Sequence, residues 1–137
     1  MKAVFFDCGT RDLTASAGLL ALRVMTGAMM LIGHGIPKIQ AYGTLSKSFR
    51  FPDIFPLGLM SPQVGLLATI AAEAGASLLI ILGIATRPAA FLLAFTMVVA
   101  AFGAHQSSPW FIKPPDVLVA KELALMYLIP MIALILS

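Results

Sequence analysis

Residues 66–82 read LLATIAAEAGASLLIIL, an almost unbroken apolar run with Glu73 near its centre. A bilayer core of about 30 Å is crossed by about 20 mostly apolar helical residues, so this run predicts a membrane helix with an acid near its midplane. The pattern recurs, because Arg23 lies in the first apolar segment and Glu122 in the last. Each such ionisable group costs roughly 2.5 to 3.5 kcal/mol to insert, which means that these residues need partners or a function.

The composition of the whole chain also indicates a membrane protein. Its 137 residues are 60% hydrophobic and 11% charged, with a mean hydropathy of +0.98, whereas soluble domains are roughly 25% charged. The net charge of +3 comes from scattered basic residues without an aromatic-interleaved basic patch, so nucleic acid is not an expected partner. The single cysteine, Cys8, excludes an intrachain disulfide and every CxxC motif, so any redox chemistry must borrow its cofactor.

Apolar segments of spanning length, or close to it, occur four times in the chain. They cover about 14–36, 62–85, 88–105 and 117–136. We therefore expect an all-α fold, a four-helix transmembrane bundle that occupies residues 1–137 as a single integral membrane domain, with lipid around it.

Helix start and stop signals delimit these segments. The first span should break at Gly35 and Pro37. The second should begin with Ser61 as its N-cap and Pro62 at the first helical position, and the third should begin in the same style at Thr86-Arg87-Pro88. The second and third spans then form a tight hairpin.

Close packing of the first span is expected at two glycines, Gly27 and Gly33, since small residues let helix backbones approach.

The depths of the charged residues can be estimated from the helical rise of about 1.5 Å per residue. Measured from the side that holds both termini, Arg23 comes out at about 14 Å, Glu73 at about 20 Å and Glu122 at about 22 Å. A cluster of these three residues in the bundle interior is thus geometrically possible, with one permanent cation offsetting two acids. The cluster either exchanges protons in a catalytic role or acts only as a structural clasp.

A second polar group is predicted toward the opposite surface. The same arithmetic puts His34 at about 30 Å and His105 at about 26 Å, and Lys38 follows His34 by one helical turn. Polar side chains would then extend from the midplane to the surface near His34, His105 and Lys38. Such an arrangement suits a quinone head group or another ligand with a polar head and an apolar tail. The histidines can equally be ordinary interfacial residues. No acid or cysteine completes a metal site with them, so no metal is expected.

Four segments of the sequence together resemble the DoxX family of small four-span membrane proteins. They are Arg23 with Gly27, residues 33–38 (GHGIPK), residues 72–87 (AEAGASLLIILGIATR) and residues 121–128 (KELALMYL), and the likeness extends over about residues 15–136. The resemblance implies a four-helix bundle in a bacterial or archaeal cytoplasmic membrane. It also implies that Arg23, His34, Lys38, Glu73 and Glu122 belong to a polar site.

The resemblance further implies a function, because related DoxD-type proteins are described as subunits of a thiosulfate:quinone oxidoreductase. The leading hypothesis is therefore a membrane subunit that contributes to the quinone site of a redox complex and is not catalytic alone. Two alternatives stay open. One is a non-catalytic anchor or accessory subunit that binds other subunits or further copies of itself, and the other is a small transporter, since charges in spans also mark transport pathways.

Overall fold

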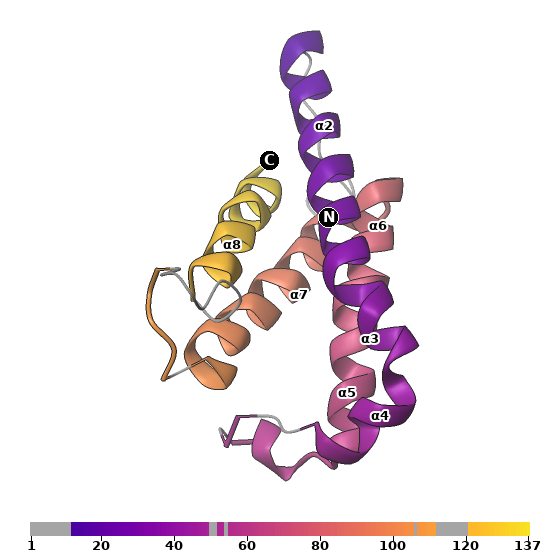
Figure 1. Ribbon diagram of the computed structural model, residues 1–137. Coiled ribbons are helices and arrows are strands. Elements are labelled where there is room, and N and C mark those ends of the chain that lie inside the picture. Colours follow the sequence, from indigo (N-terminus) through magenta and orange to yellow (C-terminus); the bar gives the residue numbers. More distant parts are fainter. Residues whose placement is uncertain (1–11, 50–51, 54, 106, 112–120) are drawn as a thin grey trace.

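The computed structural model describes residues 12–49, 52–53, 55–105, 107–111 and 121–137, and every regular element in these ranges is a helix (Figure 1). Within them, three helices are long and apolar enough to cross a membrane. They are Leu13–Gln40, Pro62–Leu82 and Thr86–Gly103.

The first long helix is continuous beyond the predicted break. It comprises α2 (Leu13–Met30), a wide π-helical turn η1 (Leu31–Gly35) and α3 (Ile36–Gln40), and α4 (Tyr42–Ser48) follows. The expected break at Gly35 and Pro37 is therefore wrong. The physical reason is the wide turn, in which the Ile36 N–H bonds to the Leu31 carbonyl five residues back. Pro37 directly follows this turn, as the second residue of α3.

The second long helix starts as the sequence predicts. Ser61 is the N-cap, its Oγ accepts a hydrogen bond of 3.4 Å from the Val64 N–H, and Pro62 opens the helix. The helix consists of α5 (Pro62–Ile70), a second π-helical turn η3 (Ala71–Gly75) and α6 (Ala76–Leu82). It ends at Gly83, whose φ of +74° is a left-handed conformation that suits glycine.

A tight turn joins this helix to the third, which confirms the predicted hairpin. The third helix comprises α7 (Thr86–Val99) and a third π-helical turn η4 (Ala100–Ala104). Its N-terminus differs from the expectation, because Ala85 occupies the N-cap position with a φ of +49° and no side chain caps the helix. Thr86 lies inside the helix and is fully buried instead.

The last helix, α8 (Lys121–Leu136), has 16 described residues and packs against α7. The predicted start of a fourth span at 117 lies outside the described residues. Figure 1 shows the end of α8 on the same side of the molecule as the start of α2, whereas α4 and the short helix η2 (Leu57–Leu59) lie on the opposite side.

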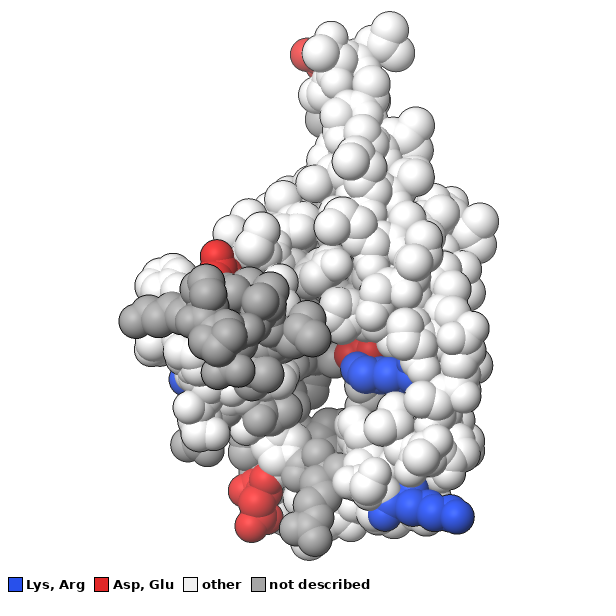
Figure 2. All heavy atoms as spheres, in the orientation of Figure 1, with Lys and Arg blue, Asp and Glu red and all other residues white. Residues whose placement is uncertain are grey.

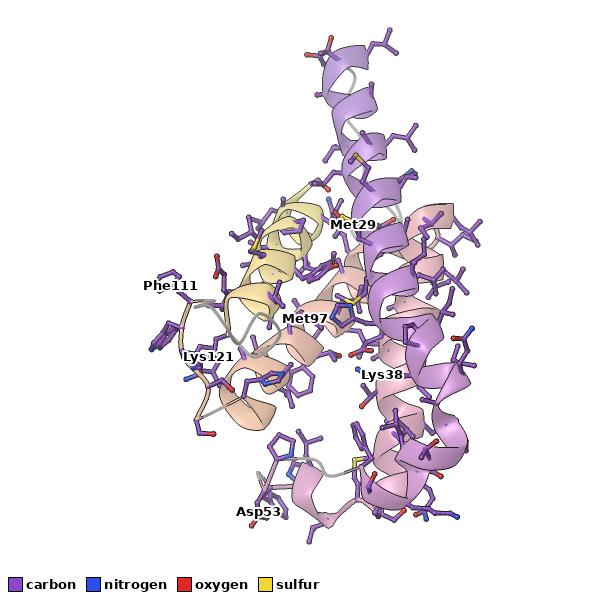
Figure 3. All side chains as sticks on the ribbon, in the orientation of Figure 1. Met29, Lys38, Asp53, Met97, Phe111 and Lys121 are labelled. Carbon is purple, nitrogen blue, oxygen red and sulfur yellow. The ribbon has the colours of Figure 1, made fainter. Side chains whose placement is uncertain are left out.

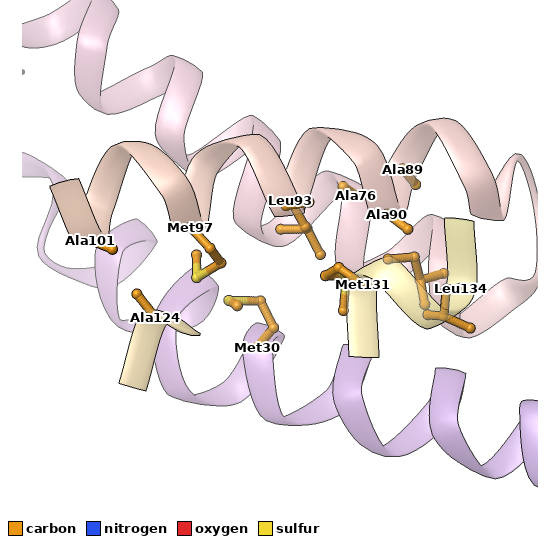
Figure 4. Close-up of a cluster of buried hydrophobic side chains, with 12 residues drawn as sticks. Met30, Ala76, Ala89, Ala90, Leu93, Met97, Ala101, Ala124, Met131 and Leu134 are labelled. Atoms are coloured by element: carbon orange, nitrogen blue, oxygen red, sulfur yellow. The ribbon is translucent and has the colours of Figure 1, made fainter. Parts of the chain in front are cut away.

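The hydrophobic core lies where α7 and α8 meet the first two long helices (Figure 4). Small side chains of α7, such as Ala90, admit the fully buried Leu93, Met131 and Leu134. Of the two predicted packing glycines, Gly27 is confirmed, since an added Cβ would stand 2.7 Å from Ile81. Gly33 is not, because a Cβ there would meet nothing within 4 Å.

Candidate functional site

The three π-helical turns bring together the polar residues of the membrane helices. η1 contains His34, η3 contains Glu73, and η4 ends directly before His105. A π-helical turn inserts one extra residue into a helix and is found frequently at functional sites. Its effect here is to redirect each helix at the point where it carries an ionisable side chain.

The first two turns are in direct contact at Gly35. A Cβ added to Gly35 would stand 3.0 Å from the Cβ and 3.1 Å from the Cα of Ala74, so the backbones approach as closely as glycine allows. Lys38 lies one turn beyond this contact and Glu73 directly before it in sequence. The close approach therefore places a lysine and a glutamate from different helices within reach of each other.

These two residues form an ion pair. Lys38 Nζ lies 2.5 Å from both carboxylate oxygens of Glu73. The Glu73 side chain is only 4% exposed, whereas that of Lys38 is 26% exposed. The glutamate of the pair is thus shielded from the surroundings, whereas the lysine is partly accessible. An ammonium has three N–H groups, and the third makes no hydrogen bond to the residues that the structure describes.

The Glu73 backbone is also fixed. The hydroxyl of the buried Ser77 donates a hydrogen bond to the Glu73 carbonyl. This side-chain donor gives a polar partner to a buried carbonyl inside the wide turn. The carboxylate therefore projects from a backbone whose position is held on two sides, by Ser77 and by the contact of Ala74 with Gly35.

His34 stands next to the ion pair and contacts α8. Its ring packs edge-on against Tyr127, with ring centroids 5.5 Å apart and an interplanar angle of 81°. The Nδ1 atom of His34 is buried and has no hydrogen-bond partner within the described part of the chain. Because buried polar atoms are nearly always satisfied, this orphaned nitrogen is a place where a ligand or a water would gain a hydrogen bond.

Between these side chains lies a cavity of about 160 Å³. Lys38 on the first long helix and Met97 on α7 both line it, and Figure 3 labels the two side chains. The space-filling view shows a basic and an acidic group touching beside an opening, with white, uncharged side chains above them (Figure 2). Described residues from all the long helices and α8 line it: His34, Lys38, Glu73, Met97, Ala100, His105, Leu123, Ala124 and Tyr127.

An apolar groove of about 190 Å³ adjoins this cavity between α2 and α8. Leu123 and Tyr127 line both spaces, and the groove is completed by Thr26, Met29, Met126 and Pro130. A cavity that contains charged side chains therefore lies next to an apolar groove, which is the division that a ligand with a polar head and an apolar tail requires.

Four of the predicted site residues thus meet in one place. His34, Lys38, Glu73 and His105, which come from three different helices, all line the cavity. The predicted Arg23–Glu73–Glu122 cluster does not form, because Lys38 takes the place that was expected for Arg23.

Arg23 lies at the other end of the second long helix. Its guanidinium stands 3.0 Å from where a Gly83 Cβ would be, and ten residues of helix, about 15 Å, separate Gly83 from Glu73. The depth estimate was wrong because the first helix does not start level with the others. About 15 Å of it, from Leu13 to Arg23, extends past the α6–α7 turn (Figure 1).

Glu122 lies in the first described turn of α8 and does not line the cavity, although the next two residues do. Its backbone N–H donates to the Trp110 carbonyl, at 3.1 Å. The neighbouring Lys121 is buried, with Nζ 4.8 Å from the centroid of the Trp110 ring.

Sequence reasoning missed two components of the site. Tyr127 was available as a signal, because a tyrosine in an apolar helix needs a place for its hydroxyl. The π-helical turns gave no such signal in the sequence. Glycines such as Gly33, Gly75 and Gly103 lie in them, but glycine is common in membrane helices generally.

The fold and site define a class: an all-helical membrane protein with several apolar helices around a small, charged cavity. A sequence model of the family described as DoxX matches residues 18–106. The chain belongs to the DoxX family and is a multi-pass membrane protein. Comparisons with curated proteins and with solved structures found no match.

Proposed function

We propose that this protein is a four-span membrane subunit of a redox complex and that it contributes a quinone site, in a bacterial or archaeal cytoplasmic membrane. The observation that carries the proposal is the Lys38–Glu73 pair beside an orphaned His34 nitrogen, in a cavity that adjoins an apolar groove. The fourth span in this proposal is α8.

The donors and acceptors of the cavity suit a quinone head group. The remaining N–H of Lys38 and a ring N–H of His34 or His105 are donors for quinone carbonyl oxygens, and the Glu73 carboxylate is an acceptor for quinol hydroxyls. A quinone supplies two-electron, two-proton redox chemistry when it is bound. Glu73 and the histidines would then hold or release protons near its oxygens.

The size of the cavity also limits what can enter. Its volume of about 160 Å³ is below the roughly 300 to 1,000 Å³ of sites that enclose a whole drug-sized ligand. Only a head group therefore fits among the charged residues. The apolar tail would lie in the groove between α2 and α8, passing Tyr127 and Leu123.

Binding of short-tailed benzoquinone and naphthoquinone analogues to the purified protein in nanodiscs tests the proposal. We expect Lys38→Met and Glu73→Gln to weaken binding by roughly tenfold or more, since each removes a charged hydrogen-bonding group. Lys47→Met is the matched control, because Lys47 is an exposed lysine on α4 outside the cavity.

The proposal is wrong if the wild-type protein neither retains nor binds quinone and if Glu73→Gln supports the same quinone-linked turnover in membranes. Co-purification with other membrane chains in the absence of quinone binding would instead favour the anchor or accessory role. Solute flux into reconstituted vesicles would favour the transporter.

A further inference from the structure

Buried polar atoms without hydrogen-bond partners also lie away from the cavity, in the region of the α6–α7 turn. Among them are Arg23 Nε and Thr86 Oγ1, and neither atom has a partner among the residues that the structure describes. Gly83 connects them, because it is in contact with the Arg23 guanidinium and precedes Thr86 by three residues in the same turn. Since buried polar atoms are rarely left unsatisfied, this region is a candidate binding site.

Thr86 is the more informative of the two. A threonine at the start of a helix usually caps it, but the Thr86 side chain is 0% exposed and caps nothing. A fully buried hydroxyl without a partner loses its hydration and gains nothing in return. Packing alone does not require the Thr86 hydroxyl, because a valine side chain would fill the same space with nearly the same shape.

The start of α7 adds the backbone N–H groups of Thr86 and Arg87, whereas Pro88 has no N–H and the Ala89 N–H bonds to the Ala85 carbonyl. The helix runs for 14 residues from Thr86, and no side chain caps its N-terminus. The first N–H groups of a helix lack intrahelical acceptors, and the helix dipole makes that end positive. Helix N-termini of this kind bind phosphate and other anions.

Positive side chains accompany this helix end. The Nη atoms of Arg23 stand 3.0 and 3.2 Å from where a Gly83 Cβ would be, so the absence of a side chain at Gly83 is what admits the guanidinium. Arg23 makes no ion pair with any described residue. Arg87 follows Thr86 directly and brings a second guanidinium to the turn.

The position of the turn identifies the anion. It connects the ends of two candidate spans, so it lies at the depth of the lipid head groups. Phosphate is the anion of this layer, and a guanidinium matches it with two parallel hydrogen bonds. Basic pockets between membrane helices bind the head groups of anionic lipids.

We propose that the α6–α7 turn binds the phosphate of an anionic phospholipid, through the Arg23 guanidinium, the Thr86 hydroxyl and the N–H groups of the first two residues of α7. This site is separate from the cavity at Lys38 and does not depend on a quinone function.

Native mass spectrometry of the detergent-purified, full-length protein, titrated with phosphatidylglycerol or phosphatidylcholine, tests this inference. We expect one phosphatidylglycerol to bind with preference over phosphatidylcholine. Arg23→Gln and Thr86→Val should each weaken its binding by roughly tenfold, as expected for loss of a hydrogen bond to a charged group. Thr86→Ser, which keeps the hydroxyl, should bind like the wild type.

Lys47→Gln is the charge-matched control, because Lys47 is an exposed cation on α4, on the opposite side of the molecule (Figure 1). Equal effects of Arg23→Gln and Lys47→Gln would overturn the site, as would equal binding of the two lipids. Inorganic phosphate that displaces the lipid at equal concentration would overturn the lipid assignment. If Arg23→Gln does not fold, wild type, Thr86→Val and Thr86→Ser still decide the outcome.

Discussion

The Lys38–Glu73 pair is the residue-scale feature on which the cavity depends. Glu73 is almost completely buried, so its charge is tolerated because Lys38 neutralises it. Removal of one partner from a buried ion pair leaves an uncompensated charge, whereas replacement of both by apolar residues is often harmless. A comparison of the stability of single and double variants therefore distinguishes a structural role of the pair from a functional one.

We expect Lys38→Met to lower the free energy of unfolding by about 3 kcal/mol, the lower end of the range for buried pairs. The double variant Lys38→Met/Glu73→Leu should recover most of that loss, because no buried charge remains. Unfolding in mixed detergent micelles, followed by circular dichroism, measures both. A double variant less stable than the single one would show that the pair stabilises the fold in its own right.

Gly83 allows a second residue-scale prediction. Its φ of +74° is unfavourable for a residue with a side chain, and a Cβ there would meet the Arg23 guanidinium at 3.0 Å. Gly83→Ala should therefore lower the free energy of unfolding by about 1 to 2 kcal/mol, from the left-handed conformation alone. The thermal midpoint in detergent checks this, and Gly75→Ala is the control because a Cβ at Gly75 would meet nothing within 4 Å.

At the scale of elements, the wide turns explain how separate helices form one site. η1 and η3 touch at Gly35 and Ala74, and the side chains on either side of that contact are His34, Lys38 and Glu73. A regular α-helix through the same residues would rotate the following side chains by about 100° for each residue omitted. The π-helical turns thus set which face of α3 carries Lys38.

The contact between these turns leads to a paired prediction. Gly35→Ala adds a methyl group 3.0 to 3.1 Å from backbone and side-chain atoms of Ala74, so we expect a loss of about 1 to 3 kcal/mol in stability, as for other overpacked positions. Gly33→Ala, in the same turn, meets no atom within 4 Å and should gain up to about 1 kcal/mol from helix propensity.

The two glycine variants are compared by their unfolding in mixed micelles. Gly35→Ala should also weaken quinone binding under the proposed function, because it moves Lys38 away from Glu73. Equal stabilities for the two variants would show that the helices do not approach each other at Gly35 as the structure has it.

At the scale of the whole molecule, the number of spans decides where the ends of the chain lie. Three described helices are candidate spans, and the proposed fourth, α8, would place both ends on one side of the membrane. The start of α2 and the end of α8 already lie on the same side of the molecule (Figure 1).

Cysteine labelling tests this arrangement. In a Cys8→Ser background, Leu13→Cys and Ser137→Cys place one thiol at each end of the described chain, and Leu13 is 85% exposed. Four spans predict that a membrane-impermeant maleimide labels both from the same side of oriented vesicles. Labelling from opposite sides would mean that α8 does not cross. Ile84→Cys, in the α6–α7 turn, reports the side of the hairpin and should be labelled with them.

The sequence by itself determined the helical class, the helix start at Ser61, the tight hairpin after it and the expectation that His34, Lys38, Glu73 and His105 belong to a polar site. These features follow from local composition, capping chemistry and the cost of a charge in hydrocarbon, which short stretches of sequence express completely. Only the tertiary structure decided which cation accompanies Glu73. The pairing depends on the offset between helices and on the extra residue in each wide turn, and neither leaves a local signature. Those two quantities placed Lys38 at the cavity and Arg23 at the α6–α7 turn.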